Sequence, residues 1–182
     1  MGHPAITGTG VFTPPNVITN DELVAAFNAY ADRFNAQNAA AIAAKEMRAK
    51  THSSSDFIVK ASGIEQRYVI DKTGPLNPHI MHPLLRQRSD DEPSLMAEMA
   101  LDAAQKALAD AGKTAADVDA VICAASNIER AYPAVAIEIQ DLLGINGFAF
   151  DMNVACSSAT FGIQAAADMV RSGSIRSALV VN

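Results

Sequence analysis

Residues 147–170, GFAFDMNVACSSATFGIQAAADMV, place a cysteine between a short apolar run and a long stretch of small residues. The run GFAFDM has the length and the aromatic content of a β-strand. After Cys156, apolar residues recur at helical spacing as far as Val170. They cover most of the helix circumference, so we expect this helix to be buried on most sides. Cys156 is therefore predicted to lie where a strand ends and a central helix begins.

The sequence around this stretch alternates between strands and helices. VDAVICAAS at 118–126 is a continuous apolar run, typical of a strand covered on both faces. Helices are predicted over 94–112 and 134–144, each followed or closed by a glycine. SALVVN at 177–182 predicts a last strand. This order predicts an α/β fold with a layered, largely parallel sheet.

The first ninety residues are less regular. PAITGTGVF at 4–12 predicts a strand followed by a turn. Thr19 and Glu22 have the spacing of a capping box, which predicts a helix that begins there. An exposed helix is predicted within 36–50 and a short strand at 66–70.

A long loop is predicted at 71–93, which carries four prolines and has no periodicity. His79 and His82 lie in it without nearby cysteines or a carboxylate cluster. We therefore interpret them as solvated loop histidines and predict no metal site.

Composition limits the class of protein. The 182 residues are 49% hydrophobic and 19% charged, which is typical of a globular domain. A net charge of −6 argues against a nucleic-acid or anionic-membrane partner. There is no secretory signal and no apolar run near the ~20 residues of a membrane helix. Two cysteines are too few for a disulfide framework, so we predict a cytoplasmic protein.

The position of Cys156 has two chemical interpretations. Unpaired amides and the helix dipole at a helix start favour a thiolate, which is a nucleophile, and can receive an oxyanion. Alternatively, the cysteine is a small buried hydrophobe, as we predict for Cys123 inside its apolar strand. Position alone leaves both open for Cys156. A cysteine protease is not favoured, because no histidine motif surrounds the thiol. GTG at 8–10 lacks the remaining features of a dinucleotide-binding loop.

Four segments carry a family resemblance. DMNVACSSATFGIQAAADMVRSGSIRSALVV at 151–181 resembles the nucleophile segment of the β-ketoacyl-ACP synthase III family, condensing enzymes of the thiolase superfamily. ITGTGVFTPPNVITNDEL (6–23), SDFIVKASGIEQRYV (55–69) and AASNIERAYPAVAIEIQDLLGI (124–145) are similar to further segments of that family in the same order.

The resemblance implies a thiolase-like layered fold, of which residues 1–182 form the N-terminal half. Such a half contains a mixed five-stranded sheet with helices on both faces. Insertions are expected at 28–56 and 72–91. The C-terminal half, which repeats the first in this family, is expected to be absent from this chain. We therefore expect either a piece of a longer protein or one chain of a two-chain assembly.

The resemblance also implies a reaction. Cys156 would accept an acyl group from acyl-CoA, and a malonyl thioester on acyl carrier protein would lose CO₂ and attack the acyl-enzyme. The product is a β-ketoacyl thioester in fatty acid biosynthesis, and no bound cofactor is needed. In the family, a histidine and an asparagine stabilise the enolate, and we expect both from the missing half. A homodimer is implied, with the strand GFAFDM pairing with its copy.

Substrate-binding residues are suggested by the same resemblance. Phe57 stands where the family has tryptophan at the CoA entrance, and Lys60 lies beside the position of the usual arginine. Arg67 matches the arginine of the same motif. Tyr132 matches a position that the partner subunit contributes, although packing beside Pro133 is an equal alternative.

Other features bear on the substrates. Small neighbours of the thiol, Ser157 among them, leave space for a substrate. The longer insertions suggest a medium-chain acyl primer. Because carrier protein is acidic, its docking requires basic residues. The available arginines are Arg86, Arg88, Arg171 and Arg176.

Two further functions remain open at this stage. One is a starter-unit acyltransferase or condensing enzyme of secondary metabolism. The other is a non-catalytic half-fold that serves as an assembly subunit, in which Cys156 would be unreactive.

Overall fold

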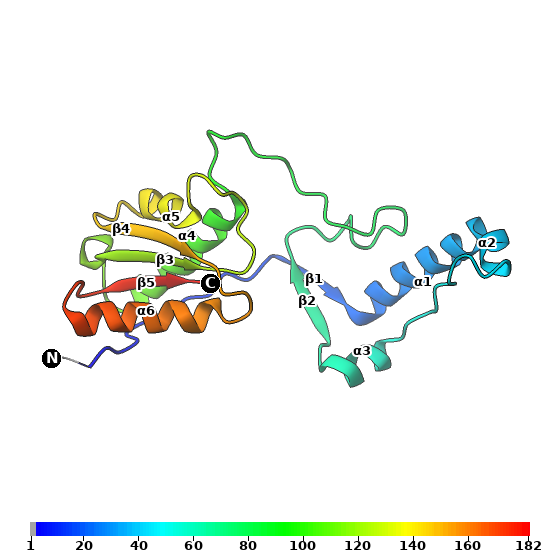
Figure 1. The fold of residues 1–182 in the computed structure, drawn as a ribbon, viewed down its shortest axis with the longest axis horizontal. Coiled ribbons are helices and arrows are strands. Elements are labelled where there is room, and N and C mark those ends of the chain that lie inside the picture. The colour runs from blue at the N-terminus through cyan, green and yellow to red at the C-terminus, as the bar shows by residue number, and fades with distance from the viewer. Residues whose placement is uncertain (1–2) are drawn as a thin grey trace. The chain divides into compact units, whose positions relative to one another are not determined.

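The computed structural model describes residues 3–182, which divide into two compact units (Figure 1). Unit 1 comprises residues 3–12 and 88–182, and unit 2 comprises Thr13–Gln87. Unit 1 contains Cys156, whereas unit 2 contains all of the predicted insertion 28–56 and most of 72–91. Within the described residues, no helix is both long enough and apolar enough to cross a membrane.

Unit 1 is built on a parallel sheet of three strands in the order β4 (Phe148–Met152), β3 (Ala120–Ala124) and β5 (Ala178–Val181). All five residues of β3 are buried, because this strand has a partner on each side and helices above and below. The prediction of three strands in a layered parallel sheet is thus confirmed.

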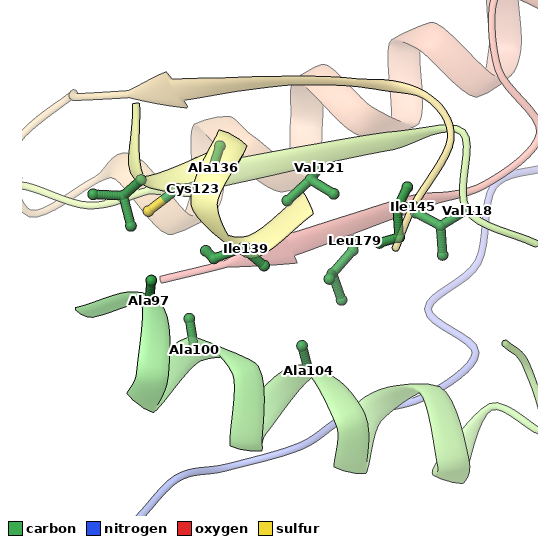
Figure 2. Close-up of a cluster of buried hydrophobic side chains, with 11 residues drawn as sticks. Ala97, Ala100, Ala104, Val118, Val121, Cys123, Ala136, Ile139, Ile145 and Leu179 are labelled. Atoms are coloured by element: carbon green, nitrogen blue, oxygen red, sulfur yellow. The ribbon is translucent and has the colours of Figure 1, made fainter. Parts of the chain in front are cut away.

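Helices cover both faces of this sheet. Alternate residues of β3 point to opposite faces, so Val121 and Cys123 pack against α4 (Leu95–Asp110) and α5 (Val135–Leu143), as Figure 2 shows. Ile122 and Ala124 pack on the other face, where α6 (Ser158–Ser172) lies. A short 3₁₀ turn, Ala115–Asp117, connects α4 to β3.

The strand predicted at 4–12 is wrong. The segment has no regular secondary structure, and its glycines lie directly on α4. A β-carbon on Gly10 would lie 2.1 Å from the carbonyl oxygen of Ala103, and one on Gly8 would lie 2.5 Å from that of Ala107. The helix face that carries these alanines therefore receives the N-terminal segment, and Ala97, Ala100 and Ala104 face the core.

The expected burial of α6 on most sides is also wrong for this chain. Only Ser158, Gly162 and Ala166 are buried, whereas Phe161 and Ile163 are 52% and 45% exposed. The described residues supply one layer against the helix, on the side of the sheet, and its opposite apolar side has no partner among them. Gly162 permits this contact, since a β-carbon there would lie 2.8 Å from Cβ of Ala124.

Unit 2 contains a separate two-stranded antiparallel sheet. Strand β1 (Asn16–Thr19) pairs with β2 (Gln66–Val69), so the predicted single five-stranded sheet is divided into two sheets. Helix α1 (Asn20–Gln37) begins with the predicted capping box. The helix expected within 36–50 forms only as the short α2 (Ala39–Ala43). Helix α3 (Ser55–Ser62) starts at the side chain of Ser54, which accepts a hydrogen bond from the N–H of Phe57.

Residues 71–93 contain no helix or strand, as predicted. Asp71 orders the first part of this loop by accepting hydrogen bonds from the Thr73 hydroxyl and the Leu84 N–H, both at 2.6 Å. These bonds lower the pKa of Asp71 to about 2. His79 and His82 are exposed, and His79 contacts the guanidinium of Arg33.

Asp119 provides an acid-sensitive contact at the beginning of β3. Its carboxylate accepts hydrogen bonds from the side chain and the backbone N–H of Arg176, at 3.0 and 2.7 Å, and its pKa is lowered to about 2. A carboxylate whose pKa is lower in the folded state than in the unfolded state stabilises the folded protein. The stabilisation is complete at pH values above the unfolded-state pKa of about 4. This stabilisation is lost as the pH falls towards 2.

We therefore expect Asp119→Asn to reduce the loss of stability between about pH 4 and pH 2. Urea unfolding midpoints measured across this range test the prediction. Superimposable pH profiles for the variant and the parent protein would contradict it.

Candidate active site

Cys156 lies in the turn between β4 and α6. The strand ends at Met152, the helix begins at Ser158, and the cysteine is exposed. This is the predicted strand-to-helix corner, at the carboxyl edge of the parallel sheet. The interpretation of Cys156 as a buried hydrophobe is wrong, because the thiol is not enclosed by the described residues.

The turn has an unusual backbone conformation immediately before the thiol. Ala155 has a φ of 47°, in the left-handed region that residues with a β-carbon rarely adopt. Its N–H donates to Oδ1 of Asn153 at 3.0 Å, and its carbonyl accepts from the hydroxyl of Ser158 at 2.8 Å. The corner is therefore fixed by side chains on both sides of Cys156.

The first turn of α6 carries backbone donors beside this corner. The N–H of Ser158 donates to the carbonyl of Ala155 at 3.1 Å. Those of Ala159 and Thr160 find no acceptor within residues 3–182. Unpaired amides at a helix start favour negative charge. Ser157 precedes the helix, is exposed, and makes no side-chain capping bond.

Cys123 differs from Cys156 in its burial and in its position within a strand. It is 3% exposed within the core of unit 1. Burial, with a smaller contribution from the charge of Asp151, raises the pKa of Cys123 to about 11. Asp151 itself caps α5 by accepting from the N–H groups of Val135 and Ala136. The prediction of a small core residue at 123 agrees with this environment.

Tyr132 lies in the loop that follows the neighbouring strand β3. The loop and the Cys156 turn are joined where Asn153 donates through Nδ2 to the carbonyl of Ser126 at 3.2 Å. Tyr132 is 92% exposed, so the alternative that it packs beside Pro133 is wrong. Its side chain is free to contact another molecule.

A buried polar network holds the base of this loop. Glu138 of α5 is 9% exposed and accepts hydrogen bonds from the N–H and the hydroxyl of Ser94, at 2.9 and 2.7 Å. Ser94 is fully buried at the start of α4. Arg130 of the loop lies 3.5 Å from the same carboxylate and donates to the carbonyl of Glu92. The loop that carries Tyr132 is thus attached to α4 and α5.

The remaining predicted substrate-binding residues belong to unit 2. Phe57 and Lys60 lie one turn apart on α3, so they share a face, and both are exposed. Arg67 of β2 donates to Oδ1 of the buried Asn20 at 2.9 Å, which gives it a structural contact within this unit. Binding of a substrate by these three residues stays a prediction.

Three of the four arginines considered for carrier-protein docking pair with carboxylates. Arg88 forms a two-pronged pair with Glu98, with both distances at 2.6 Å. Arg171 pairs with Asp168, and Arg176 pairs with Asp119. These three arginines therefore do not form a patch of unpaired positive charge.

Two cavities within residues 3–182, one in each unit, have no contact with Cys156. In unit 1, an open cavity of about 430 Å³ is bordered by Asp119, Phe148 and Arg176, at the amino ends of the strands and thus at the opposite edge of the sheet. In unit 2, a cavity of about 230 Å³ lies between α1 and α3. No group of three metal-ligating side chains occurs in the part of the chain that the structure describes.

Sequence reasoning missed the structural roles of two residues of the corner, Asn153 and Ser158. Asparagine and serine are common in turns and at helix starts, because their side chains bond to nearby backbone groups. That general preference is the sequence signal that could have indicated these two residues. Which backbone groups these two side chains bond to depends on the left-handed conformation of Ala155. The sequence does not show that conformation.

Comparison with known proteins identifies the family. The family model described as 3-oxoacyl-[acyl-carrier-protein (ACP)] synthase III matches residues 150–182, which include Cys156. A β-ketodecanoyl-[acyl-carrier-protein] synthase of Pseudomonas aeruginosa is 54% identical over 156 residues, covering 86% of this chain and 45% of that protein. A β-ketoacyl-[acyl-carrier-protein] synthase III of Granulibacter bethesdensis is 34% identical and covers 100% of this chain and 43% of its own length.

Solved structures agree in fold. The 3-oxoacyl-[acyl-carrier-protein] synthase III of Aquifex aeolicus superimposes with a TM-score of 0.68 at 23% identity, covering 96% of this chain and 42% of that one. The synthase III of P. aeruginosa gives 0.64 at 25% identity, covering 96% and 40%. The fold is thus thiolase-like, and the chain spans less than half the length of the relatives that it matches. By sequence and by fold, the chain belongs to the β-ketoacyl-[acyl-carrier-protein] synthase III family.

Proposed function

We propose that this chain forms the nucleophile-bearing part of a β-ketoacyl-[acyl-carrier-protein] synthase, with Cys156 as the residue that carries the acyl group. One observation supports this most directly. The exposed thiol lies between β4 and α6, at the carboxyl edge of the sheet, inside the residues that match the family model.

The first half of the reaction transfers the acyl group. The Cys156 thiolate attacks the carbonyl carbon of an acyl-CoA, a new C–S bond forms, and the tetrahedral intermediate carries a negative oxygen. The free amides at the start of α6 are donors for this oxygen. When the intermediate collapses, the bond to the CoA sulfur breaks and CoA leaves as its thiolate.

The second half forms the carbon–carbon bond. Malonyl-ACP loses CO₂, and the resulting enolate carbon attacks the carbonyl of the acyl-enzyme. The bond to Cys156 breaks, and the thiolate is regenerated together with β-ketoacyl-ACP, which is two carbons longer than the primer. The histidine and asparagine that assist decarboxylation would come from the part of the relatives that this chain does not match.

A medium-chain primer fits this function best. The relative from P. aeruginosa that is 54% identical is named for a β-ketodecanoyl product. A ten-carbon product, less the two carbons that malonyl contributes, corresponds to an eight-carbon primer. We therefore propose octanoyl-CoA as the preferred acyl donor.

The assembly would be a cytoplasmic homodimer. Strand β4 is an edge of the three-stranded sheet, and Phe148, which is 46% exposed, stacks on Phe150 at 6.4 Å between ring centroids. An apolar edge strand is a natural place for pairing with a second copy. Tyr132 would then extend from one protomer to the site of the other.

The test uses the full-length protein, which means this chain together with the proposed C-terminal half. The substrates are acyl-CoAs with acyl groups of two to sixteen carbons. Intact-mass spectrometry and peptide mapping should show one acyl group on Cys156, loaded fastest from the eight-carbon donor. Addition of malonyl-ACP should remove the acyl group and give β-ketodecanoyl-ACP. A folded protein that takes no acyl group would instead support a non-catalytic assembly role. Loading without condensation would support a starter-unit transferase.

A further inference from the structure

We propose that Ser158 is a positioning residue, whose hydroxyl holds the turn that presents Cys156. The inference rests on the proposed acyl-carrying function of Cys156 and assigns the means by which the thiol is oriented. Ser158 does not contact the reacting atoms; it acts through the backbone of Val154 and Ala155.

The hydroxyl of Ser158 makes two hydrogen bonds across the turn. It accepts from the N–H of Val154 at 2.8 Å and donates to the carbonyl of Ala155 at 2.8 Å. A hydroxyl has one proton and two lone pairs, so both bonds are made at once and their directions are fixed. The side chain is 2% exposed, so water does not compete for these bonds.

This bridge spans the one strained residue of the corner. At a φ of 47°, the β-carbon of Ala155 is sterically crowded, which destabilises this conformation. Glycine, which has no β-carbon, adopts it without this cost. The bonds on either side of it, to Val154 and from its own carbonyl, oppose relaxation to an ordinary conformation. Without the hydroxyl, the N–H of Val154 loses its partner and the carbonyl of Ala155 keeps only the backbone N–H of Ser158, at 3.1 Å. The strain at Ala155 then favours rearrangement of the turn.

The residue that would move with this turn is Cys156. Its position follows directly from the backbone of Ala155, whereas the amides of Ala159 and Thr160 belong to the helix. Rearrangement of the turn would therefore change the direction of the thiol relative to these donors. Small displacements of a nucleophile reduce its rate strongly, because attack depends on distance and alignment.

Ser172 provides a matched control. It is the same residue type, lies at the other end of α6, is exposed, and its hydroxyl donates to the carbonyl of Met169 at 2.9 Å within that helix. Its side chain therefore bonds to the backbone as that of Ser158 does, but at a place away from the turn that carries Cys156.

The experiment compares Ser158→Ala and Ser172→Ala in the full-length protein. Single-turnover loading of Cys156 from octanoyl-CoA gives the maximal rate and the half-saturating concentration. We expect Ser158→Ala to lower the maximal rate about tenfold with little change in the half-saturating concentration. Ser172→Ala should stay within about twofold of the parent.

A second substitution separates positioning from packing. Glycine adopts a positive φ without the penalty of a β-carbon, so Ala155→Gly should relieve the need for the hydroxyl. We expect the double variant Ala155→Gly/Ser158→Ala to recover loading to within about threefold of the parent. If Ser158→Ala alone does not fold, loading by the folded double variant still tests the proposal.

Alkylation of Cys156 by iodoacetamide at neutral pH distinguishes a failure of the proposed acyl-carrying function from a failure of the positioning role of Ser158. If the parent protein takes no acyl group, the proposed function fails, and the positioning role is then judged from alkylation. Slower alkylation in Ser158→Ala, restored in the double variant, supports the role. Parent-like rates in a folded Ser158→Ala, or a folded double variant that stays slow, would overturn it.

Discussion

Replacement of Cys156 by alanine is expected to reduce acyl loading from octanoyl-CoA by at least about a thousandfold. In the proposed reaction the thiolate sulfur of Cys156 forms the bond to the acyl group, and the described structure places no second exposed thiol in unit 1. The measurement is single-turnover loading of the full-length protein, followed by intact mass. Decarboxylation of malonyl-ACP should persist at a reduced rate, since the proposed function assigns that step to a histidine and an asparagine outside this turn.

Cys123→Ala is the matched control for this prediction. Its sulfur is in the core, and burial raises its pKa to about 11, so it is not a nucleophile near neutral pH. We expect a loss of about 1 kcal/mol in unfolding free energy, from the small cavity that remains, and normal loading. Persistent loading of Cys156→Ala, or loss of loading in folded Cys123→Ala, would refute the assignment of the nucleophile.

Glu138→Ala is expected to lower the free energy of unfolding by about 3 kcal/mol. The substitution removes the acceptor for both the N–H and the hydroxyl of Ser94, which is fully buried, and the carboxylate partner of Arg130. Buried donors without acceptors are costly, because water cannot replace the lost partner. Equilibrium urea unfolding of the parent and the variant measures the difference.

Asp141→Ala, on the same helix but at an exposed position, provides the control and should change stability by less than about 0.5 kcal/mol. Glu138→Gln should give an intermediate loss, because the amide still offers one acceptor oxygen. Equal stabilities for Glu138→Ala and Asp141→Ala would show that the network contributes little. The same variants also test whether the loop of Tyr132 depends on this anchor.

The sequence was most informative where local patterns determine the structure. The run 118–126 became the central strand β3, and the capping box at Thr19 and the glycine at 144 mark real helix ends. The segment 4–12 failed because β-branched residues and glycines suit both a strand and a close approach to a helix. Its partner, the alanine face of α4, is about a hundred residues away in the sequence.

For the candidate site, the location of the thiol between a strand and a helix was predictable, but the side chains that support the turn were not. The position of Cys156 followed from a strand pattern that meets a helix pattern, together with the family resemblance. The bridge by Ser158 depends on the conformation of Ala155, and the exposure of Tyr132 depends on how its loop is anchored. The pairing of Arg176 with Asp119 joins residues 57 positions apart, which periodicity does not indicate.

The two sides of α6 have different consequences for protein engineering. On the side of Gly162, the sheet leaves no room for even one additional methyl group, so substitutions there would displace the helix that follows the nucleophile. On the side of Phe161 and Ile163, which are 52% and 45% exposed, the described residues leave room for larger side chains. Redesign of this helix should therefore vary the outer side and leave the sheet-facing residues unchanged.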